Sequence, residues 1–209
     1  MSASCVLKPP RLKRGDAVGI IAPASSLPHQ EYLARGVQFW RNQGYRVQLS
    51  SNIEQVNAYL AGSDVERLAG VHQMFRDPEI KALICLRGGY GSLRLLAYLD
   101  YNLIRNHPKI LVGYSDITAL HLACQQKTGL VTFHGPMLYP ELGAQTLSPY
   151  TRINLLNTLT ASSPIGKIAP APNLPAPVTI TPGRVQGLVT GGNLSLVTAT
   201  LSTPFEIDT

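Results

Sequence analysis

The sequence predicts an α/β fold in which helices cover both faces of a parallel sheet. Short apolar runs rich in β-branched residues recur along the chain, segments of helical length separate them, and most of the runs are apolar at consecutive positions. Strands that are apolar on both sides must be buried on both faces, which is typical of parallel sheets between helical layers. With 44% hydrophobic and 14% charged residues in 209, the composition excludes a disordered chain.

The first predicted strand is the apolar run 17–23, AVGIIAP, and a helix is predicted over 28–44. Ser25 or Ser26 is the expected N-cap of this helix, because a serine oxygen can accept a hydrogen bond from a free N–H of the first turn. Gly44 is the expected end of the helix, since glycine readily adopts the left-handed backbone that follows a helix.

The next elements are a strand at 45–50, then a helix, then a third strand at 80–87, IKALICLR, which is strongly apolar. The helix is predicted to begin at Ser63, because Ser63 and Glu66 have the spacing of a capping box. In that motif the serine side chain accepts from the third helical N–H, and the glutamate reaches back to the serine N–H.

After the glycine-rich turn that follows residue 87, a helical stretch is predicted to begin near Ser92. A strand is then predicted at 109–113, a helix at 116–127 and a strand at 130–133. Together these elements predict a parallel sheet whose strands are joined by helical crossovers.

The composition changes beyond a last helix predicted at 148–159. Residues 163–183 contain six prolines, which cannot donate to a helix or a central strand, so this stretch is read as a linker. A strand at 185–190, a Gly-Gly-Asn turn and a helix at 194–201 are predicted to start another unit. The predicted division is an N-terminal α/β domain at 1–162, a linker at 163–183 and the start of an incomplete C-terminal domain at 184–209.

Charge, cysteine content and hydropathy indicate which partners, cysteine chemistry and cellular location to expect. The net charge is +6, but outside 8–14 the basic residues are scattered and aromatic residues are only 7%, so a nucleic-acid partner is not expected. Cys5, Cys85 and Cys124 are three cysteines without CxxC spacing, which favours reduced thiols over disulfides or a zinc site, with Cys85 and Cys124 in the core. No apolar run is long enough to span a membrane, and no signal peptide is apparent, so a cytoplasmic location is expected.

Ser115 is the candidate nucleophile. It lies in the segment GYSD, which follows a predicted buried strand and opens a predicted helix. A sharp turn there would expose the hydroxyl, the helix N-terminus would favour developing negative charge, and the next N–H could face an oxyanion. The pattern is incomplete, because Ile117 stands where a full GxSxG motif has glycine, and Ser115 as a simple N-cap remains an alternative.

The glycine-rich segment 87–91, RGGYG, is the second candidate. It also follows a strand, and the carboxyl ends of parallel strands share one edge of a sheet, where ligands collect. One N–H from Gly88 or Gly89 and one from Asp116 would form a two-donor oxyanion hole. A phosphate-binding turn and a purely structural turn are the alternatives, although GGYG lacks the full patterns of nucleotide-binding loops.

A serine nucleophile needs a base, and the five histidines offer no convincing one. His121 lies six residues after Ser115 on the same predicted helix, about 120° around its axis, and is read as a surface or core residue. His134 follows a predicted strand at the same edge of the sheet, with a loop residue bonded to backbone as its alternative role.

Five segments together strongly resemble the LD-carboxypeptidase family, the serine peptidases of the S66 group. They are LKRGDAVGIIAPAS, LICLRGGYGSLRLL, KILVGYSDITALHLA, VTFHGPM and GLVTGGNLSLVTATLSTPFE, which occur in this order between Leu12 and Glu206. The resemblance implies a flavodoxin- or Rossmann-like doubly wound domain followed by a C-terminal domain of sheet and helices. It also implies a Ser-Glu-His triad with Ser115 as nucleophile and an oxyanion hole formed by Asp116 and the Gly88–Gly89 turn.

In the family the triad glutamate and histidine come from the second domain, and neither can be assigned to a residue here. The resemblance therefore implies a fragment that is inactive alone. It further implies release of terminal D-alanine from cytoplasmic murein tetrapeptides during peptidoglycan recycling, no metal, no cofactor, no membrane partner, and a homodimer. Arg87, Tyr90 and His134 are the candidate substrate-binding residues.

Three alternatives to this function stay open at the level of sequence. One is a non-catalytic or degenerate module that binds peptidoglycan peptides. Another is a hydrolase of peptide-nucleotides of the microcin C7 type, since substrate selectivity depends largely on loops and on the second domain. The third, nucleotide binding at the glycine-rich turn, predicts stabilisation by ATP or NAD, which we do not expect.

Overall fold

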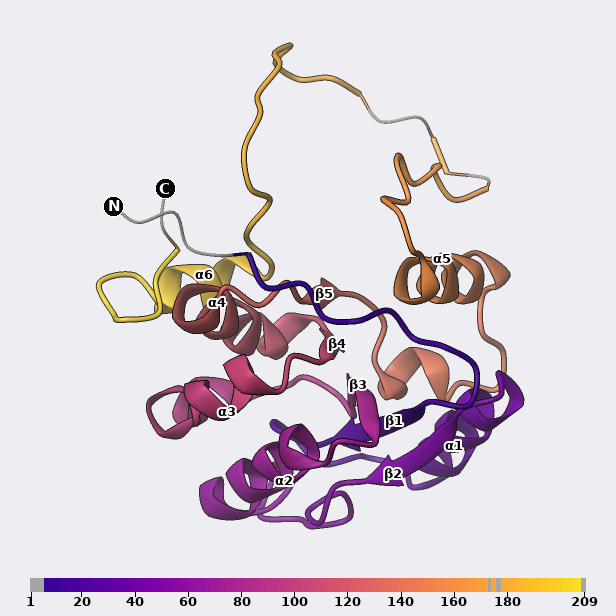
Figure 1. Cartoon of the computed structure of the whole chain (residues 1–209), viewed down its shortest axis with the longest axis vertical. Helices are drawn as coiled ribbons and strands as arrows, with labels where there is room; N and C mark the ends of the chain where they lie inside the picture. Colours follow the sequence, from indigo (N-terminus) through magenta and orange to yellow (C-terminus); the bar gives the residue numbers. More distant parts are fainter. Residues whose placement is uncertain (1–5, 173, 176–177, 208–209) are drawn as a thin grey trace.

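Five parallel strands form one sheet in the order β2-β1-β3-β4-β5, as the computed structural model shows for residues 6–172, 174–175 and 178–207 (Figure 1). The strands are β1 Ala17–Ile21, β2 Arg46–Leu49, β3 Ile80–Cys85, β4 Ile110–Gly113 and β5 Phe133–His134. The helices are α1 Glu31–Asn42, α2 Asp64–Arg76, α3 Tyr101–Asn106, α4 Thr118–Thr128, α5 Pro149–Thr160 and α6 Leu194–Ala199. The predicted α/β fold with a parallel sheet is confirmed.

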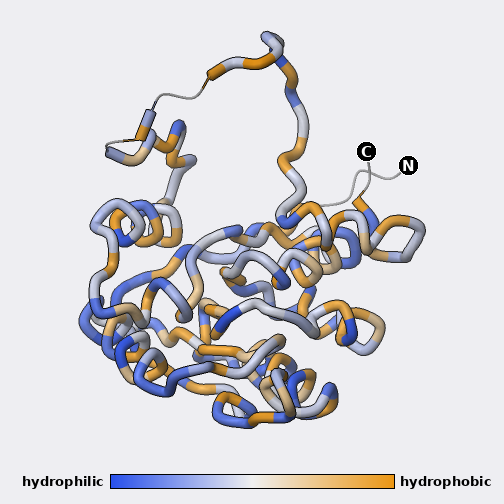
Figure 2. Tube along the Cα trace, turned by 180° about the vertical axis from the view of Figure 1, so that it is seen from behind, coloured by the Kyte–Doolittle hydropathy of each residue, from blue (hydrophilic) through white to orange (hydrophobic). Residues whose placement is uncertain are grey.

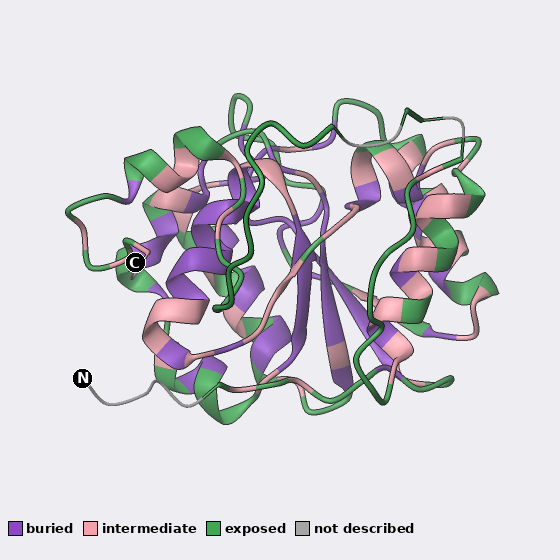
Figure 3. Cartoon of the chain, turned by 90° about the horizontal axis from the view of Figure 1, so that it is seen from above, coloured by how far each residue is buried: buried purple, intermediate pink, exposed green. Residues whose placement is uncertain are grey.

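Side chains alternate between two hydrophobic cores, one on each face of the sheet. In β1, Ala17 and Ile21 enter the first core, whereas Val18 and Ile20 enter the second. Helices α2, α3 and α4 cover the first core, and α1, α5 and the segment Leu138–Leu142 cover the second. Figure 3 shows buried strands in the middle of the molecule, between helices that carry exposed residues, and the buried strands are β1, β3 and β4. The consecutive apolar positions in β1 therefore reflect burial on both faces.

The order of the strands reverses beside β1. From β1 the chain crosses to β2 at one edge, returns to β3 on the other side of β1, and then continues outward through β4 to β5. In an open parallel sheet, ligands bind outside the carboxyl ends of the strands where the order reverses. The loops that follow β1 and β3 meet at this point, and the turn that follows β4 lies next to them.

Most predicted elements are present, with shifted ends. The capping box of Ser63 and Glu66 begins α2 as predicted. Helix α1, in contrast, begins at Glu31 with Gln30 in the N-cap position, so neither Ser25 nor Ser26 caps it. Ser25 is used elsewhere, because its hydroxyl accepts a hydrogen bond from the N–H of Tyr90. The last strand is Phe133–His134 rather than 130–133, and Leu130 instead forms an isolated bridge with Leu7.

The described residues between α5 and α6 form an arch that stands away from the body of the molecule (Figures 1 and 2). The strand predicted at 185–190 is absent from this described segment, and Val185 and Val189 are fully or almost fully exposed. The apolar pattern is present, as the hydropathy colouring in Figure 2 shows, but no described strand pairs with it. Beyond the arch α6 packs against α4, where Leu196 and Phe205 contact the first core.

Two further sequence expectations concern cysteines and membranes. Cys85 and Cys124 are free thiols buried in the first core, as predicted, and Cys5 lies outside the described residues. Burial raises the pKa of both described thiols well above the usual range of cysteine. Among the helices of the described residues, none combines the length and the apolar character that a membrane crossing requires.

Candidate active site

Ser115 occupies the sharp turn between β4 and α4. Gly113 ends the strand, Tyr114 is extended, and Ser115 opens a 3₁₀ turn that leads directly into the helix. The φ angle of Ser115 is +59°, a left-handed conformation that costs a residue with a side chain about 1–2 kcal/mol. Backbone strain of this kind concentrates at functional sites, because the surrounding structure has to hold it.

The N-cap alternative for Ser115 does not describe this turn. The residues in the N-cap positions of the 3₁₀ turn and of α4 are Tyr114 and Ile117, and Ser115 lies inside the first helical turn. Its hydroxyl is therefore carried by a strained turn at the amino end of a helix. The partial positive charge of that end favours an anion that develops there.

The glycine-rich turn after β3 lies directly against the Ser115 turn. A methyl group built on Gly88 would lie 3.1 Å from Ser115 Cβ and 3.3 Å from the backbone nitrogen of Asp116. Gly88 is buried, whereas Gly89, at a φ of +106°, and Tyr90 are exposed. The structure thus brings together the three residues of the predicted oxyanion hole, Gly88, Gly89 and Asp116, at one edge of the sheet.

Hydrogen bonds connect these turns to the loop that follows β1. The N–H of Ser25 donates to the carbonyl of Gly88 over 3.2 Å, and the Ser25 hydroxyl accepts from the N–H of Tyr90 over 3.2 Å. The buried carboxylate of Asp116 accepts from the N–H of Ser92 over 2.9 Å. The side chain of Asp116 therefore connects the Ser115 turn to the end of the glycine-rich segment.

Arg67 is a buried residue that holds together the loops around the candidate site, and the sequence analysis did not predict this role. Its side chain is completely buried and donates to the carbonyl of Pro23, to that of Gly91 over 3.0 Å, and to the carboxylate of Asp64. One guanidinium thus joins the end of the β1 loop, the glycine-rich turn and α2. No sequence motif distinguishes Arg67 from the other arginines, because its role depends on contacts with residues 24 and 44 positions away.

His121 and His134 both lie near the Ser115 turn. His121 is buried in α4 and its Nε2 bonds to the carbonyl of Gly113 over 2.9 Å, so of the two roles left open by the sequence, surface or core, it has the core role. Burial lowers the pKa of His121 to about 4, so its ring is neutral at pH 7. His134 is exposed and stands beside Gly113 in the register of β4 and β5, with its ring centre 6.1 Å from that of Tyr114.

Arg87 and Tyr90 lie at the same edge of the sheet as Ser115, but their side chains contact other residues. The Arg87 guanidinium donates to the carbonyl of Ser26 over 3.1 Å and stacks over the ring of Tyr139 at 5.2 Å. The Tyr90 ring is half exposed and packs edge-on against Tyr59, with 5.9 Å between the ring centres. Both side chains thus pack on neighbouring loop residues.

Glu141 is a second residue that the sequence analysis missed. The hydroxyl of Tyr114 donates to Glu141 Oε1 over 2.7 Å, and Glu141 Oε2 accepts from the N–H of Met137 over 3.2 Å. Partial burial, together with this hydrogen bond, raises the pKa of Tyr114 to about 12. Within the described part of the chain, no imidazole or carboxylate is hydrogen-bonded to the Ser115 hydroxyl, and no group of three or more potential metal ligands occurs.

The chain is similar in sequence to known proteins. The model of the LD-carboxypeptidase N-terminal domain matches residues 18–135, which include both turns. The probable murein peptide carboxypeptidase of Bacillus subtilis is 47% identical over 204 residues, which cover 97% of this chain and 62% of that protein. The murein tetrapeptide carboxypeptidase of Pseudomonas aeruginosa is 34% identical over 183 residues, which cover 85% of this chain and 58% of that protein.

Solved structures show the same fold. The microcin C7 self-immunity protein MccF aligns with a TM-score of 0.83 and 27% identity, over 97% of this chain and 68% of that chain. The muramoyltetrapeptide carboxypeptidase of Oxalobacter formigenes aligns with a TM-score of 0.77 and 28% identity, over 92% of this chain and 62% of that chain. The chain spans 62% of the length of the Bacillus relative.

Proposed function

The chain belongs to the LD-carboxypeptidase family, and we propose that Ser115 is the nucleophile of a serine-type carboxypeptidase. The observation that carries the proposal is the contact between the two turns, in which Gly88 faces the backbone nitrogen of Asp116 beside a strained Ser115. Peptide hydrolysis by a serine needs an exposed hydroxyl next to two N–H donors that can bind the tetrahedral oxyanion. The close contact of Gly88 with Ser115 and Asp116, and the partial exposure of Ser115, support this role.

In the proposed reaction, Ser115 Oγ attacks the carbonyl carbon of the scissile peptide bond, and the carbonyl oxygen becomes negatively charged. The N–H of Asp116 and an N–H of Gly88 or Gly89 stabilise this oxygen. A base must take the Ser115 proton and later pass it to the leaving amine, and a carboxylate must orient that base. The family resemblance assigns both groups to a C-terminal domain, and we propose that residues 184–209 belong to that domain and 163–183 are the linker.

We propose a murein peptide as the substrate, with hydrolysis of an L,D bond and release of a terminal D-alanine. The names of the Bacillus and Pseudomonas relatives, which are murein peptide carboxypeptidases, support this choice. The second candidate is a peptide-nucleotide, which the similarity to MccF favours. Solved MccF structures contain aspartyl sulfamoyl adenosine and glutamyl sulfamoyl guanosine.

The 209-residue chain alone is proposed to be inactive or nearly so. Loss of triad partners costs about 10⁴ to 10⁶ in turnover, and no described imidazole lies in hydrogen-bond contact with the Ser115 hydroxyl. Robust release of D-alanine by this chain would contradict the proposal.

The role of Ser115 is tested in a chimera that joins this chain to the C-terminal part of the Bacillus relative. D-alanine release from a murein tetrapeptide and amine release from a peptide-nucleotide are measured side by side. Ser115→Ala should abolish both activities, whereas Ser162→Ala, at an exposed position after α5, should leave them unchanged. Activity that survives Ser115→Ala would remove Ser115 from its role, and binding of the peptide without turnover by the unaltered chimera would favour the binding module.

A further inference from the structure

Glu141 holds the residue that precedes the candidate nucleophile. The hydroxyl of Tyr114 donates to Glu141 Oε1 over 2.7 Å, and the next residue along the chain is Ser115. A hydroxyl bonded to a carboxylate over so short a distance makes one of the stronger hydrogen bonds in proteins. Because the two partners are 27 positions apart in the sequence, the bond connects the Ser115 turn to a distant part of the chain.

The segment Leu138–Leu142, which carries Glu141, is firmly anchored in the fold. Leu138 and Leu142 are 0% and 2% exposed and belong to the second core. A methyl group built on Gly36 of α1 would lie only 2.4 Å from Leu138 Cγ, so the leucine packs directly on the backbone of this helix. Glu141 therefore reaches Tyr114 from a rigid support.

The same segment also contacts the glycine-rich turn. The N–H of Tyr139 donates to the carbonyl of Leu86 over 2.8 Å, and the Arg87 guanidinium stacks over the Tyr139 ring. Arg87 immediately precedes Gly88. The segment thus contacts the start of both turns, one through Tyr139 and the other through Glu141.

The strained Ser115 has a side-chain hydrogen bond on each side of it. The carboxylate of Asp116, the residue after it, accepts from the N–H of Ser92 over 2.9 Å. The hydroxyl of Tyr114, the residue before it, donates to Glu141. A left-handed φ angle such as the +59° of Ser115 persists only where the surrounding structure holds it. The carboxylates of Asp116 and Glu141 therefore hold the turn from both sides.

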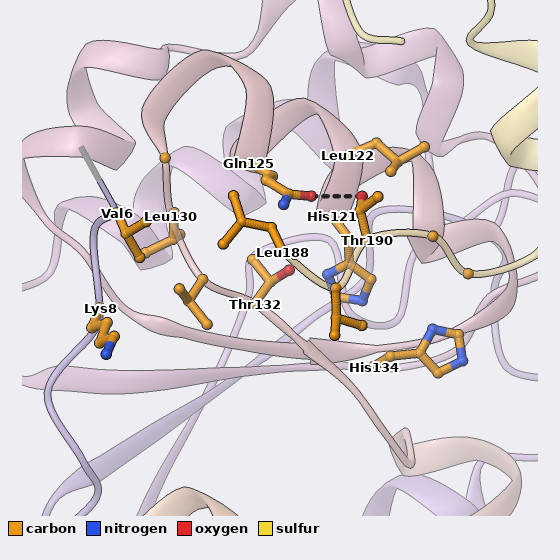
Figure 4. A pocket seen from close by; sticks show the side chains of 15 residues that line it. Val6, Lys8, His121, Leu122, Gln125, Leu130, Thr132, His134, Leu188 and Thr190 are labelled. Atoms are coloured by element: carbon orange, nitrogen blue, oxygen red, sulfur yellow. Dashed lines mark hydrogen bonds between the residues drawn. The ribbon is translucent and has the colours of Figure 1, made fainter. Parts of the chain in front are cut away.

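Two histidines near the turn do not take the place of Glu141. Figure 4 shows His121 and His134 in the wall of a cavity beside α4. His121 bonds to the carbonyl of Gly113, and the ring centre of His134 lies 6.1 Å from that of Tyr114. Within the part of the chain that the structure describes, Glu141 is the hydrogen-bond partner of the Tyr114 hydroxyl.

We propose that Glu141 is a positioning residue, which acts through Tyr114 to hold the Ser115 hydroxyl in place against the N–H groups that bind the oxyanion. This inference rests on the proposed function, because it requires Ser115 to be the nucleophile. Glu141 takes no part in the bond-making steps. A displacement of about 1 Å between reacting groups can cost about 10²-fold in rate, so loss of the hydrogen bond lowers turnover. A purely structural role of Glu141 would lower stability and leave kcat unchanged in the folded protein.

Tyr114→Phe and Glu141→Ala each remove one partner of the hydrogen bond. In the chimera with the Bacillus C-terminal part, each should lower kcat at least about tenfold. KM should change much less, because alignment of the reacting groups matters most in the transition state. Tyr101→Phe is the matched control and should keep full kcat, since its hydroxyl donates over 2.6 Å to the carbonyl of Leu96, outside both turns. Full kcat in the folded Glu141→Ala chimera would overturn the proposal.

Two further variants separate a role through Tyr114 from an independent one. The double variant Tyr114→Phe/Glu141→Ala should lose no more kcat than either single variant, because Glu141 has nothing to hold once the hydroxyl is gone. Glu141→Gln keeps an oxygen that can accept from Tyr114 and should recover part of the kcat lost in Glu141→Ala. Losses that multiply in the double variant, or a glutamine variant no better than the alanine variant, would contradict the proposal.

An amide spectrum of the 209-residue chain gives a readout that does not depend on the chimera. Glu141→Ala should shift the ¹⁵N–¹H signals of Ser115 and Asp116. Added to Tyr114→Phe, the same change should shift these two signals no further, because the contact is already lost. Signals of Ser115 and Asp116 that keep their positions in Glu141→Ala would overturn the proposal.

Ser115→Ala, measured in the same kinetic assay, separates the failure of this inference from the failure of the proposed function. If Ser115→Ala keeps activity, Ser115 is not the nucleophile and both proposals fail. If it abolishes activity while Tyr114→Phe and Glu141→Ala keep full kcat, only the positioning role of Glu141 fails.

Discussion

Gly88→Ala tests the contact between the two turns more sharply than any other single change. The new methyl carbon would lie 3.1 Å from Ser115 Cβ, whereas carbon atoms in favourable contact are about 3.5–4.0 Å apart. The backbone of Gly88 is not left-handed, so alanine is allowed there and the effect comes from the contact alone. The two turns must separate by a few tenths of an ångström to relieve it.

The expected effect on stability is modest and the expected effect on catalysis is large. Overpacking of this size costs about 1–3 kcal/mol of folding free energy. Displacing one oxyanion donor costs about 10²–10³ in kcat, and the methyl group would also stand 3.3 Å from the Asp116 nitrogen that is to bind the oxyanion. KM should change much less, because the donors bind the transition state better than the substrate.

Stability is measured by urea unfolding of the 209-residue chain, and kcat and KM are measured in the chimera with the Bacillus C-terminal part. Gly187→Ala is the matched control, because a methyl group there would meet no atom within 4 Å. Full kcat in the folded Gly88→Ala chimera would show that the Gly88 and Asp116 backbones do not meet at the reacting carbonyl.

Three further predictions concern the folded chain itself. Arg67→Met should lower the free energy of unfolding by about 2–5 kcal/mol, because two loop carbonyls lose their buried donor, whereas Asp64 keeps its ion pair with Arg94. A loss below about 1 kcal/mol in urea unfolding would speak against that role. Ser115→Gly should raise the unfolding free energy by up to about 1 kcal/mol by relieving the left-handed strain, and an unchanged or lower midpoint would contradict the strained turn. Burial lowers the pKa of His121 from its ordinary 6.5 to about 4. Between these two pH values the unfolded chain protonates the His121 ring and the folded chain does not. About 3 kcal/mol of the free energy of unfolding, present above pH 6.5, should therefore be lost as the pH falls toward 4. His121→Gln should flatten that slope, and an equally steep slope in the variant would assign the effect to other groups.

The fold could be predicted in large part because its main signal is local. Runs such as AVGIIAP and IKALICLR are apolar at consecutive positions, and the structure buries them on both faces of the sheet. The capping box at Ser63 is likewise a contact within four residues. The prediction of a strand at 185–190 was wrong for the described structure, because an apolar pattern forms a strand only where a partner strand is available.

The candidate site was likewise predicted where its signal is local and missed where it depends on contacts distant in sequence. Ser115 and Gly88 lie at strand ends, and placing them at one edge follows from the parallel sheet alone. Arg67 and Glu141 escaped prediction because their partners are distant in sequence: Gly91 and Pro23 for the arginine, Tyr114 for the glutamate. Ser25 was expected as a helix cap but binds the N–H of Tyr90, because α1 begins only at Glu31, six residues further along the chain.

The central claim is that the Ser115 hydroxyl and the N–H groups of the two turns act on one carbonyl. The test is a crystal structure of the chimera after reaction with a phenyl phosphonate ester analogue of a D-alanine-terminated peptide, in which Ser115 Oγ displaces phenoxide from phosphorus. We expect a bond from phosphorus to Ser115 Oγ, with one phosphonyl oxygen about 2.7–3.1 Å from the Asp116 nitrogen and from a nitrogen of Gly88 or Gly89. Phosphorus bound to another residue, or that oxygen turned toward solvent, would contradict it.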